Sequence, residues 1–189
     1  YKPVYWSVVG ASALAEAEVE YKDKVSFAID VRFSVADPQA FLQAFEGISP
    51  ADIAGQLSVV IWTTTPWTLP SNQAVCLHAE LTYALVRCEL GQGTETILLA
   101  KELVDDVMAR YGCEQFQLLA ETSGFKLENL LLDHPLVNRQ VPVILGEHVN
   151  TESGTGAVHT APDHGVDDFN VGKQYGLRTL NLIDDHGVF

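Results

Sequence analysis

Hydrophobic and polar residues alternate along much of the chain, which is the pattern of half-buried strands. Residues 25–34 show this alternation, and residues 57–62 are so uniformly apolar that they predict a strand buried on both faces. Residues 12–20 have high helix propensity, yet their glutamates alternate with apolar residues, so both a helix and an edge strand remain open. Further strands are predicted at residues 73–78, 82–89, 95–100, 115–120 and 141–150.

Three helices are predicted from apolar spacing and from the residues at their ends. Asp37 and Pro38 fit the N-cap and the first position of a short helix that Gly47 ends. The clearest helix covers residues 101–111, where apolar side chains share one face and a glycine follows. A third, short helix is expected over residues 167–175.

The order of these elements indicates the fold class. Strands follow strands more often than they alternate with helices, and the turn at residues 91–93 predicts a hairpin. We therefore expect an α+β fold, a β-barrel-like curved sheet with a few peripheral helices. The length of 189 residues favours a single domain, residues 1–189.

The charge balance excludes whole classes of function. The chain contains 11 Lys and Arg residues against 25 Asp and Glu residues, a net charge of −14. It therefore lacks the basic face of a typical nucleic-acid-binding protein and the polybasic patch of a membrane-surface protein. No apolar stretch approaches the ~20 residues that a membrane helix requires.

Methionine and cysteine positions indicate the setting of the chain. The single methionine is Met108, so we expect a fragment of a larger protein, without a signal peptide. Cys76, Cys88 and Cys113 are odd in number and widely spaced, which favours neither a disulfide framework nor a zinc site. We expect three buried thiols in a reducing cytoplasm.

Hydroxyl side chains are concentrated directly after the apolar strand at residues 57–62. Residues 62–72 read Trp-Thr-Thr-Thr-Pro-Trp-Thr-Leu-Pro-Ser-Asn. Hydroxyls both donate and accept hydrogen bonds, so this segment could bind a sugar hydroxyl, an ester carbonyl and a water together. Its two prolines make the backbone stiff. An ordinary strand-to-turn connection explains the same composition.

A glycine-rich segment, residues 154–169, is the second candidate for chemistry. Its glycines allow close backbone approach or positive φ. His159 is expected to follow a short apolar strand, and Asp167 and Asp168 to begin a helix, where carboxylates are favoured by the helix dipole. Both aspartates therefore have a structural explanation beside a functional one.

Other kinds of site receive little support from the sequence. A metal site made of His159, Asp163 and His164 is conceivable, but nothing in their spacing specifies a tetrahedral geometry. The glycines lack the lysine of a P-loop and the spacing of a Rossmann fingerprint. Without a GxSxG nucleophile elbow, a hydrolase built on this chain would use water as its nucleophile.

The segments TTTPWTLPSN and GTGAVHTAPDHGVDD together resemble the editing domain of isoleucyl-tRNA synthetase, a connective insertion in the class I catalytic core. The resemblance covers essentially the whole chain. Valyl and leucyl relatives have an arginine within their Thr-Thr-x-Pro motif, whereas Thr65-Pro66-Trp67 stands here, as in the isoleucyl type. The HIGH and KMSKS signatures of the parent enzyme are absent from this chain, so it should not activate isoleucine alone.

The resemblance implies roles for the residues of both segments. In the first, Trp67 would shape the pocket wall, Asn72 matches an asparagine implicated in editing, and four threonines would line the pocket: Thr63, Thr64, Thr65 and Thr68. In the second, His159 matches the histidine that limits pocket size, and Asp168 the aspartate that binds the α-ammonium group of the substrate.

The implied function is proofreading hydrolysis of mischarged Val-tRNA(Ile), without a metal or cofactor. One methylene in an apolar pocket discriminates by only ~1–3 kcal/mol, for which isoleucyl-tRNA synthetase itself is the standard example. The implied partners are the tRNA(Ile) acceptor end and, in cis, the rest of a cytoplasmic synthetase; the fragment should be monomeric. A valyl or leucyl editing domain and a non-catalytic module that binds amino acids or adenosine remain alternatives.

Two positions depart from the family pattern. Ser7 and Gly10 stand where many relatives have a cysteine pair, so a metal or redox role there has no support. Asp163 is acidic where several relatives have glycine. The acidity of the chain also implies weak binding of intact tRNA, with other synthetase domains gripping the tRNA body.

Overall fold

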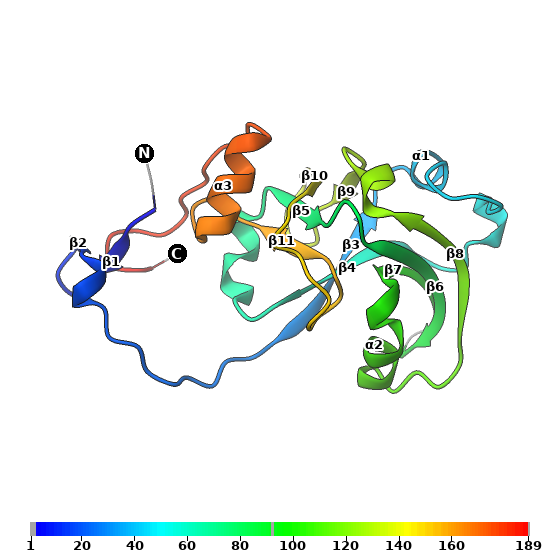
Figure 1. Cartoon of the computed structure of the whole chain (residues 1–189), viewed down its shortest axis with the longest axis horizontal. Helices are drawn as coiled ribbons and strands as arrows, with labels where there is room; N and C mark the ends of the chain where they lie inside the picture. The colour runs from blue at the N-terminus through cyan, green and yellow to red at the C-terminus, as the bar shows by residue number, and fades with distance from the viewer. Residues whose placement is uncertain (1–2, 92, 189) are drawn as a thin grey trace.

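A mixed nine-stranded sheet dominates the computed structural model, which describes residues 3–91 and 93–188 (Figure 1). Its strand order is β11-β5-β10-β9-β3-β4-β7-β6-β8. The strands are β3 (Ile29–Val35), β4 (Leu57–Thr63), β5 (Ala74–Leu77), β6 (Thr82–Leu90), β7 (Gly93–Ala100), β8 (Phe116–Ser123), β9 (Leu131–Asp133), β10 (Gln140–Leu145) and β11 (Val158–Thr160).

Short helices surround this sheet, and Figure 1 shows α1, α2 and α3 at its periphery. The prediction at Asp37 is confirmed, because its carboxylate accepts a hydrogen bond from the Ala40 amide at 3.0 Å. The predicted helix over residues 101–111 begins with a 3₁₀ turn. The helices are η1 (Glu16–Glu18), α1 (Pro38–Leu42), η2 (Pro50–Asp52), η3 (Pro66–Ser71), η4 (Lys101–Leu103), α2 (Val104–Arg110), η5 (Gly124–Leu127) and α3 (Val166–Gln174).

The α+β prediction is confirmed, but the curved sheet is not a closed barrel. Strands β11 and β8 form its two edges. The chain before β11 turns back toward the middle of the sheet, where the Trp62 amide donates to the Ala157 carbonyl and the Ala100 amide to the Thr155 carbonyl. The hairpin prediction is also confirmed, since β6 pairs with β7 up to Leu90 opposite Gly93.

Several predicted element boundaries were wrong. The strand expected at residues 25–34 begins only at Ile29, and the preceding Val25 and Phe27 are 98% and 86% exposed. Residues 12–20 form β2 (Ser12–Leu14) followed by η1 rather than one helix or strand. Alternation shows that a segment could bury one face, but a strand forms only where a neighbouring strand pairs with it.

Two hydrophobic clusters lie on opposite sides of the β5–β11 end of the sheet. The larger is the main core, which includes Val75 and Leu77 of β5. The smaller packs Ala74 and Cys76 of β5 against Val171 of α3. Because successive side chains of a strand point to opposite faces, His159 of β11, opposite Val75, shares the main-core face.

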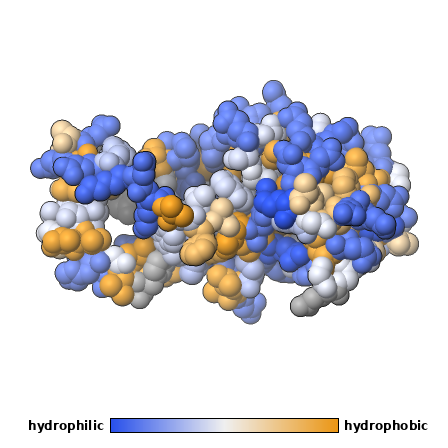
Figure 2. Space-filling model, turned by 90° about the horizontal axis from the view of Figure 1, so that it is seen from below, coloured by the Kyte–Doolittle hydropathy of each residue, from blue (hydrophilic) through white to orange (hydrophobic). Residues whose placement is uncertain are grey.

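The described ends of the chain lie together, apart from the sheet (Figure 1). Strand β1 (Tyr5–Ser7) pairs antiparallel with β2, and the Trp6 indole donates to the Asp185 carbonyl at 2.8 Å. We call residues 3–14 and 181–188 the terminal ribbon. In Figure 2 the surface is hollowed beside this ribbon, and hydrophilic and hydrophobic residues are interspersed on the face shown. Within the described residues, no helix is both long and apolar enough to cross a membrane.

Candidate functional site

The threonine turn, residues 63–72, joins β4 to β5 and is ordered by its own hydroxyl groups. The Thr63 hydroxyl accepts a hydrogen bond from the Thr65 amide at 3.1 Å. The Thr68 hydroxyl donates to the Thr65 carbonyl at 2.8 Å. Such side-chain bonds to nearby backbone favour a turn over continued strand. Pro66, at the first position of η3, starts the 3₁₀ helix.

The turn has an inner and an outer side. Thr63 and Thr68 are buried, with 5% and 6% of their surfaces exposed. Thr64, Thr65 and Trp67 are exposed. The predicted threonine lining is therefore divided between an interior polar row and residues at the surface.

Two glycines of the glycine loop, residues 154–161, lie too close to other residues to carry a side chain. Gly156 has φ +75°, and a Cβ there would lie 2.2 Å from the Ala100 Cβ. Gly154 has φ +82° and packs on the Trp62 side chain. The Tyr83 hydroxyl donates to the Gly156 carbonyl at 2.7 Å. These contacts fix the path of the loop across the sheet to the start of β11.

His159 of β11 meets the threonine turn directly. Its Nε2 lies 3.1 Å from the Thr68 hydroxyl. Because Thr68 already donates its one hydroxyl proton to the Thr65 carbonyl, we assign the Nε2 proton to His159, which donates to Thr68. The two sequence segments therefore form one site, joined by a contact between residues 91 positions apart.

The environment of His159 keeps its ring neutral. Burial lowers the pKa of His159 to about 4, and nearby His164 and His134 act in the same direction. Its Nδ1 atom is buried, and no described residue forms a hydrogen bond with it. A neutral ring can limit the size of a pocket without attracting a carboxylate or repelling an ammonium group.

Asp168 lies in the first turn of α3, at the end of β11. Its Oδ2 atom accepts a hydrogen bond from the Ala161 amide at 2.9 Å. Burial raises the pKa of Asp168, while the Ala161 amide, His148 and His164 partly oppose that increase. Asp168 is half-buried, and its hydrogen-bond partner Ala161 follows His159 by two residues in the sequence.

Asn72 is placed differently from the other predicted site residues. Its side chain is fully buried, and its Nδ2 atom donates to the Ala74 carbonyl at 2.8 Å, at the start of β5. Its Oδ1 atom has no hydrogen-bond partner among the described residues. The structure thus places Asn72 behind the turn, where it joins the turn to the strand that pairs with β11.

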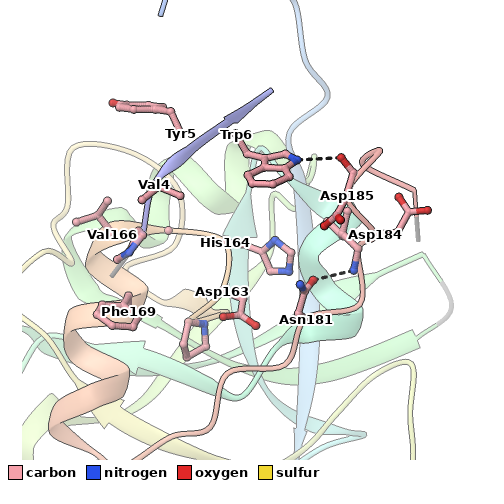
Figure 3. A pocket seen from close by; sticks show the side chains of 14 residues that line it. Val4, Tyr5, Trp6, Asp163, His164, Val166, Phe169, Asn181, Asp184 and Asp185 are labelled. Carbon is pink, nitrogen blue, oxygen red and sulfur yellow. Dashed lines mark hydrogen bonds between the residues drawn. The ribbon is translucent and has the colours of Figure 1, made fainter. Parts of the chain in front are cut away.

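A cleft of about 720 Å³ opens beside the glycine-rich segment rather than over the threonine turn (Figure 3). Figure 3 shows His164 and Asp163 directed into it, across from Trp6 of the terminal ribbon. No threonine of the turn lines this cleft. The Thr68–His159 contact, and not this cleft, therefore marks the predicted site.

Comparison with known proteins identifies the family. A family model described as "Leucyl-tRNA synthetase, editing domain" matches residues 52–187. The chain is 56% identical over its whole length to the isoleucine–tRNA ligase of Marinomonas sp. (strain MWYL1). The chain belongs to the synthetase editing-domain family. The isoleucyl resemblance is confirmed, since the ligase of Thioalkalivibrio sulfidiphilus is likewise 57% identical across 100% of the chain.

This editing domain spans about a fifth of its curated relatives, 20% of the Marinomonas protein and 19% of the Thioalkalivibrio protein. Among solved structures, the P. knowlesi cytosolic leucyl-tRNA synthetase editing domain matches with a TM-score of 0.63. The match covers 84% of this chain and 68% of that chain at 11% identity. At this identity the similarity supports the fold alone.

The cysteine thiols of the editing domain are buried. Cys76, Cys88 and Cys113 are free and buried, as predicted. Burial raises the pKa of Cys76 to about 12, so this thiol is inert at neutral pH. In the described part of the chain, no group of three or more His, Cys, Asp or Glu residues is arranged to bind a metal. The set His159, Asp163 and His164 is therefore not arranged as a metal site either.

Sequence reasoning missed two residues that contact the turn of the editing domain. His134 lies 2.9 Å from the Leu69 carbonyl, and Arg139 donates to the carbonyls of Pro70 and Asn72. Both belong to the connection between β9 and β10. A lone histidine before a proline and a lone arginine before a strand carry no recognisable local signal.

Proposed function

We propose that this domain hydrolyses the aminoacyl ester of Val-tRNA(Ile), as the proofreading site of an isoleucyl-tRNA synthetase. The observation that carries the proposal is the Thr68–His159 contact, which unites the two segments that resemble isoleucyl editing domains. The similarity to isoleucine–tRNA ligases along the whole chain supports the same assignment. The relevant chemistry is transfer of an acyl group to water.

Exclusion by size accounts for the choice of substrate. The buried row formed by Thr63, Thr68 and His159 gives the site a stiff wall. A wall that admits the valine side chain rejects isoleucine, because atomic overlap rises steeply with each added methylene whereas a small gap costs little. The neutral His159 ring suits this role, since it adds bulk without charge.

Asp168 binds the α-ammonium group of the ester in this proposal. A half-buried carboxylate makes a strong charge-assisted hydrogen bond with an ammonium group. The Ala161 amide already holds one carboxylate oxygen, so the direction of the other is fixed. An N-acylated aminoacyl-tRNA should therefore be a poor substrate.

Thr64 and Thr65 are exposed residues at the surface of the turn, and in this proposal their hydroxyls position water and the ester carbonyl. Trp67, half exposed beside them, forms the rim. The free hydroxyl of the terminal ribose would assist proton transfer, so the mechanism needs no side-chain base. The net charge of −14 fits a site that admits only the single-stranded acceptor end, while the rest of a cytoplasmic synthetase binds the tRNA body.

Two conservative variants test the proposal in the full-length synthetase that carries this sequence. Asp168→Asn keeps an acceptor for the Ala161 amide but removes the charge. We expect it to slow Val-tRNA(Ile) deacylation about 10–100-fold, the loss of one charge-assisted bond of ~1.5–3 kcal/mol. Asp167→Asn, at the exposed neighbouring position, is the matched control and should retain the rate.

Isoleucine activation provides the internal standard for this experiment and should be equal in both variants. A near-normal deacylation rate in Asp168→Asn would remove Asp168 from the mechanism. An unmodified synthetase that binds valyl-adenosine without hydrolysing Val-tRNA(Ile) would instead identify the domain as a non-catalytic binding module.

A further inference from the structure

The C-terminal end of η3 presents backbone carbonyls that the helix itself does not satisfy, as at every helix end. Side chains of the β9–β10 connection donate to three carbonyls here, those of Leu69, Pro70 and Asn72. The Leu69 carbonyl also accepts a hydrogen bond from the Asn72 amide at 2.9 Å. These carbonyls directly follow Thr68, the partner of His159. The connection therefore holds the part of the turn next to Thr68.

His134 is a buried link in this arrangement, with 6% of its surface exposed. Its Nδ1 atom accepts hydrogen bonds from the amides of Leu136 and Val137 at 3.1 and 3.3 Å. Nδ1 therefore carries no proton, and Nε2 donates to the Leu69 carbonyl at 2.9 Å. The Phe33 ring packs edge-on against the imidazole and limits its rotation.

Arg139 supplies the second link. Its Nη2 atom donates to the Pro70 carbonyl at 3.1 Å and to the Asn72 carbonyl at 2.6 Å. One planar guanidinium group thus spans the last residues of the turn. Both bonds come from one nitrogen of that group, and a lysine ammonium at the end of a flexible chain would hold its donors less rigidly than the planar guanidinium group does.

We propose that His134 and Arg139 are positioning residues that set the place of Thr68 against His159, and thereby the discrimination between valine and isoleucine. This inference rests on the proposed function. Neither side chain needs to touch the substrate. Both act through the backbone of η3, which the two prolines already stiffen from within.

Discrimination by one methylene depends on the precise placement of the pocket wall more than on the strength of any single bond. A pocket that discriminates by one methylene works on differences of a fraction of an ångström. Loss of the Leu69 or Pro70 bond frees the end of η3, and a displacement of about 1 Å at a reacting site can change rates about 100-fold. A loosened wall both misplaces the valyl ester and accepts the larger side chain.

The test compares deacylation of Val-tRNA(Ile) and Ile-tRNA(Ile) by the full-length synthetase. We expect His134→Ala to lower kcat for the valyl ester about tenfold with little change in KM, and to raise relative activity on the isoleucyl ester. His134→Gln retains an amide donor for the Leu69 carbonyl and should recover most of this loss. Arg139→Lys should show a smaller change of the same kind.

Two controls separate positioning from general destabilisation. Val141→Ala removes core packing from β10 without affecting a bond to the turn, so it should lower Tm while leaving the isoleucyl-to-valyl ratio unchanged. Asn138→Ala, an exposed position in the same connection, should change neither quantity.

The possible outcomes distinguish this inference from the function on which it rests. Absence of Val-tRNA(Ile) deacylation in the unmodified synthetase contradicts the proposed function itself. If that activity is present, an unchanged ratio in His134→Ala overturns the positioning role, as does an equal change in Val141→Ala. If His134→Ala does not fold, the isoleucyl-to-valyl ratio is measured in His134→Gln and Arg139→Lys instead. The inference is refuted if both variants have the same ratio as the unmodified synthetase.

Discussion

The two halves of the site differ in how closely they pack. The threonine turn is held by hydrogen bonds to its hydroxyls and carbonyls, from residues such as His134 and Arg139. The glycine loop also accepts hydrogen bonds, from the Trp62 and Ala100 amides and the Tyr83 hydroxyl, but in addition it packs so closely that Gly156 lies against Ala100 with no space for a Cβ. The turn should therefore tolerate changes that preserve polar atoms, whereas the loop should tolerate only changes that add no volume.

The halves also differ in charge. The turn contributes neutral hydroxyl groups, whereas the loop and the start of α3 contribute two titratable groups, His159 and Asp168. Burial lowers the pKa of His159 and raises the pKa of Asp168. Acid should consequently affect the loop side of the site first. The four predictions below test these differences, beginning with the largest expected effect.

Gly156→Ala should have the largest effect, because it combines overlap with Ala100 and a strained positive φ. We expect a loss of about 3–5 kcal/mol in the free energy of unfolding. Gly47→Ala is the matched control, with φ +72° but no atom near the added Cβ, and should cost only about 1 kcal/mol. Urea denaturation of the 189-residue chain measures both, and equal losses would refute the packing argument.

Stability should fall as the pH decreases from 7 to 4. The pKa of His159 is lowered from 6.5 in the unfolded chain to about 4 in the folded protein, so its contribution is complete above pH 6.5 and is lost toward pH 4. The shift corresponds to at most about 3 kcal/mol. The lowered pKa of His134 acts in the same direction, and the raised pKa of Asp168 acts against it.

His159→Gln separates these contributions, since the amide can still donate to Thr68 but does not titrate. Denaturation midpoints measured between pH 4 and 7 should show a shallower slope in His159→Gln than in the unmodified chain. An identical slope would mean that His159 is not the main titrating group.

Thr68→Val tests the polar half of the site with a side chain of nearly the same shape. It removes the bond to the Thr65 carbonyl and leaves the His159 Nε2 proton without an acceptor, which should cost about 1–3 kcal/mol. Thr64→Val, at an exposed position of the turn, should remain within about 0.5 kcal/mol of the unmodified chain. Thermal unfolding of the pair checks the difference, and similar Tm values would contradict it.

Arg110→Ala should have the smallest effect. Arg110 of α2 forms a bidentate ion pair with Asp30 at 2.9 and 3.1 Å and reaches the Gly154 carbonyl at 3.4 Å. The pair is partly exposed, so we expect a loss of about 0.5–1 kcal/mol that becomes smaller at high salt. Arg178→Ala, also at an exposed position, serves as the control and should show neither the loss nor the salt dependence.

Features set by near neighbours were predictable from sequence. The Asp37 cap, the helix before Gly112 and the β6–β7 hairpin depend on contacts within a few residues, and the structure contains all three; residue 92 of the predicted turn lies outside the described residues. The strand expected from residue 25 fails because its first four residues have no partner strand. The periodicity of apolar residues indicates which face of a segment could be buried, but it does not indicate whether a neighbouring strand pairs with that segment.

The structure brings together some of the residues predicted for the site and places others apart. His159 and Thr68 meet as the resemblance implied, whereas Asn72 lies behind the turn. His134 and Arg139 were missed because their partners lie 65 to 69 residues away in the sequence. Only the arrangement of β10 beside β5, with β9 on the other side of β10, brings them to the turn.

By itself, the sequence determined the caps, the turns and the two chemically distinctive segments, because backbone conformation and hydrogen bonding over a few residues depend on local side chains. The tertiary structure alone decided that β11 pairs with β5, that a neutral His159 donates to Thr68, and that a separate connection holds the turn. Those features depend on strand order and on burial, and both arise only when distant segments pack together.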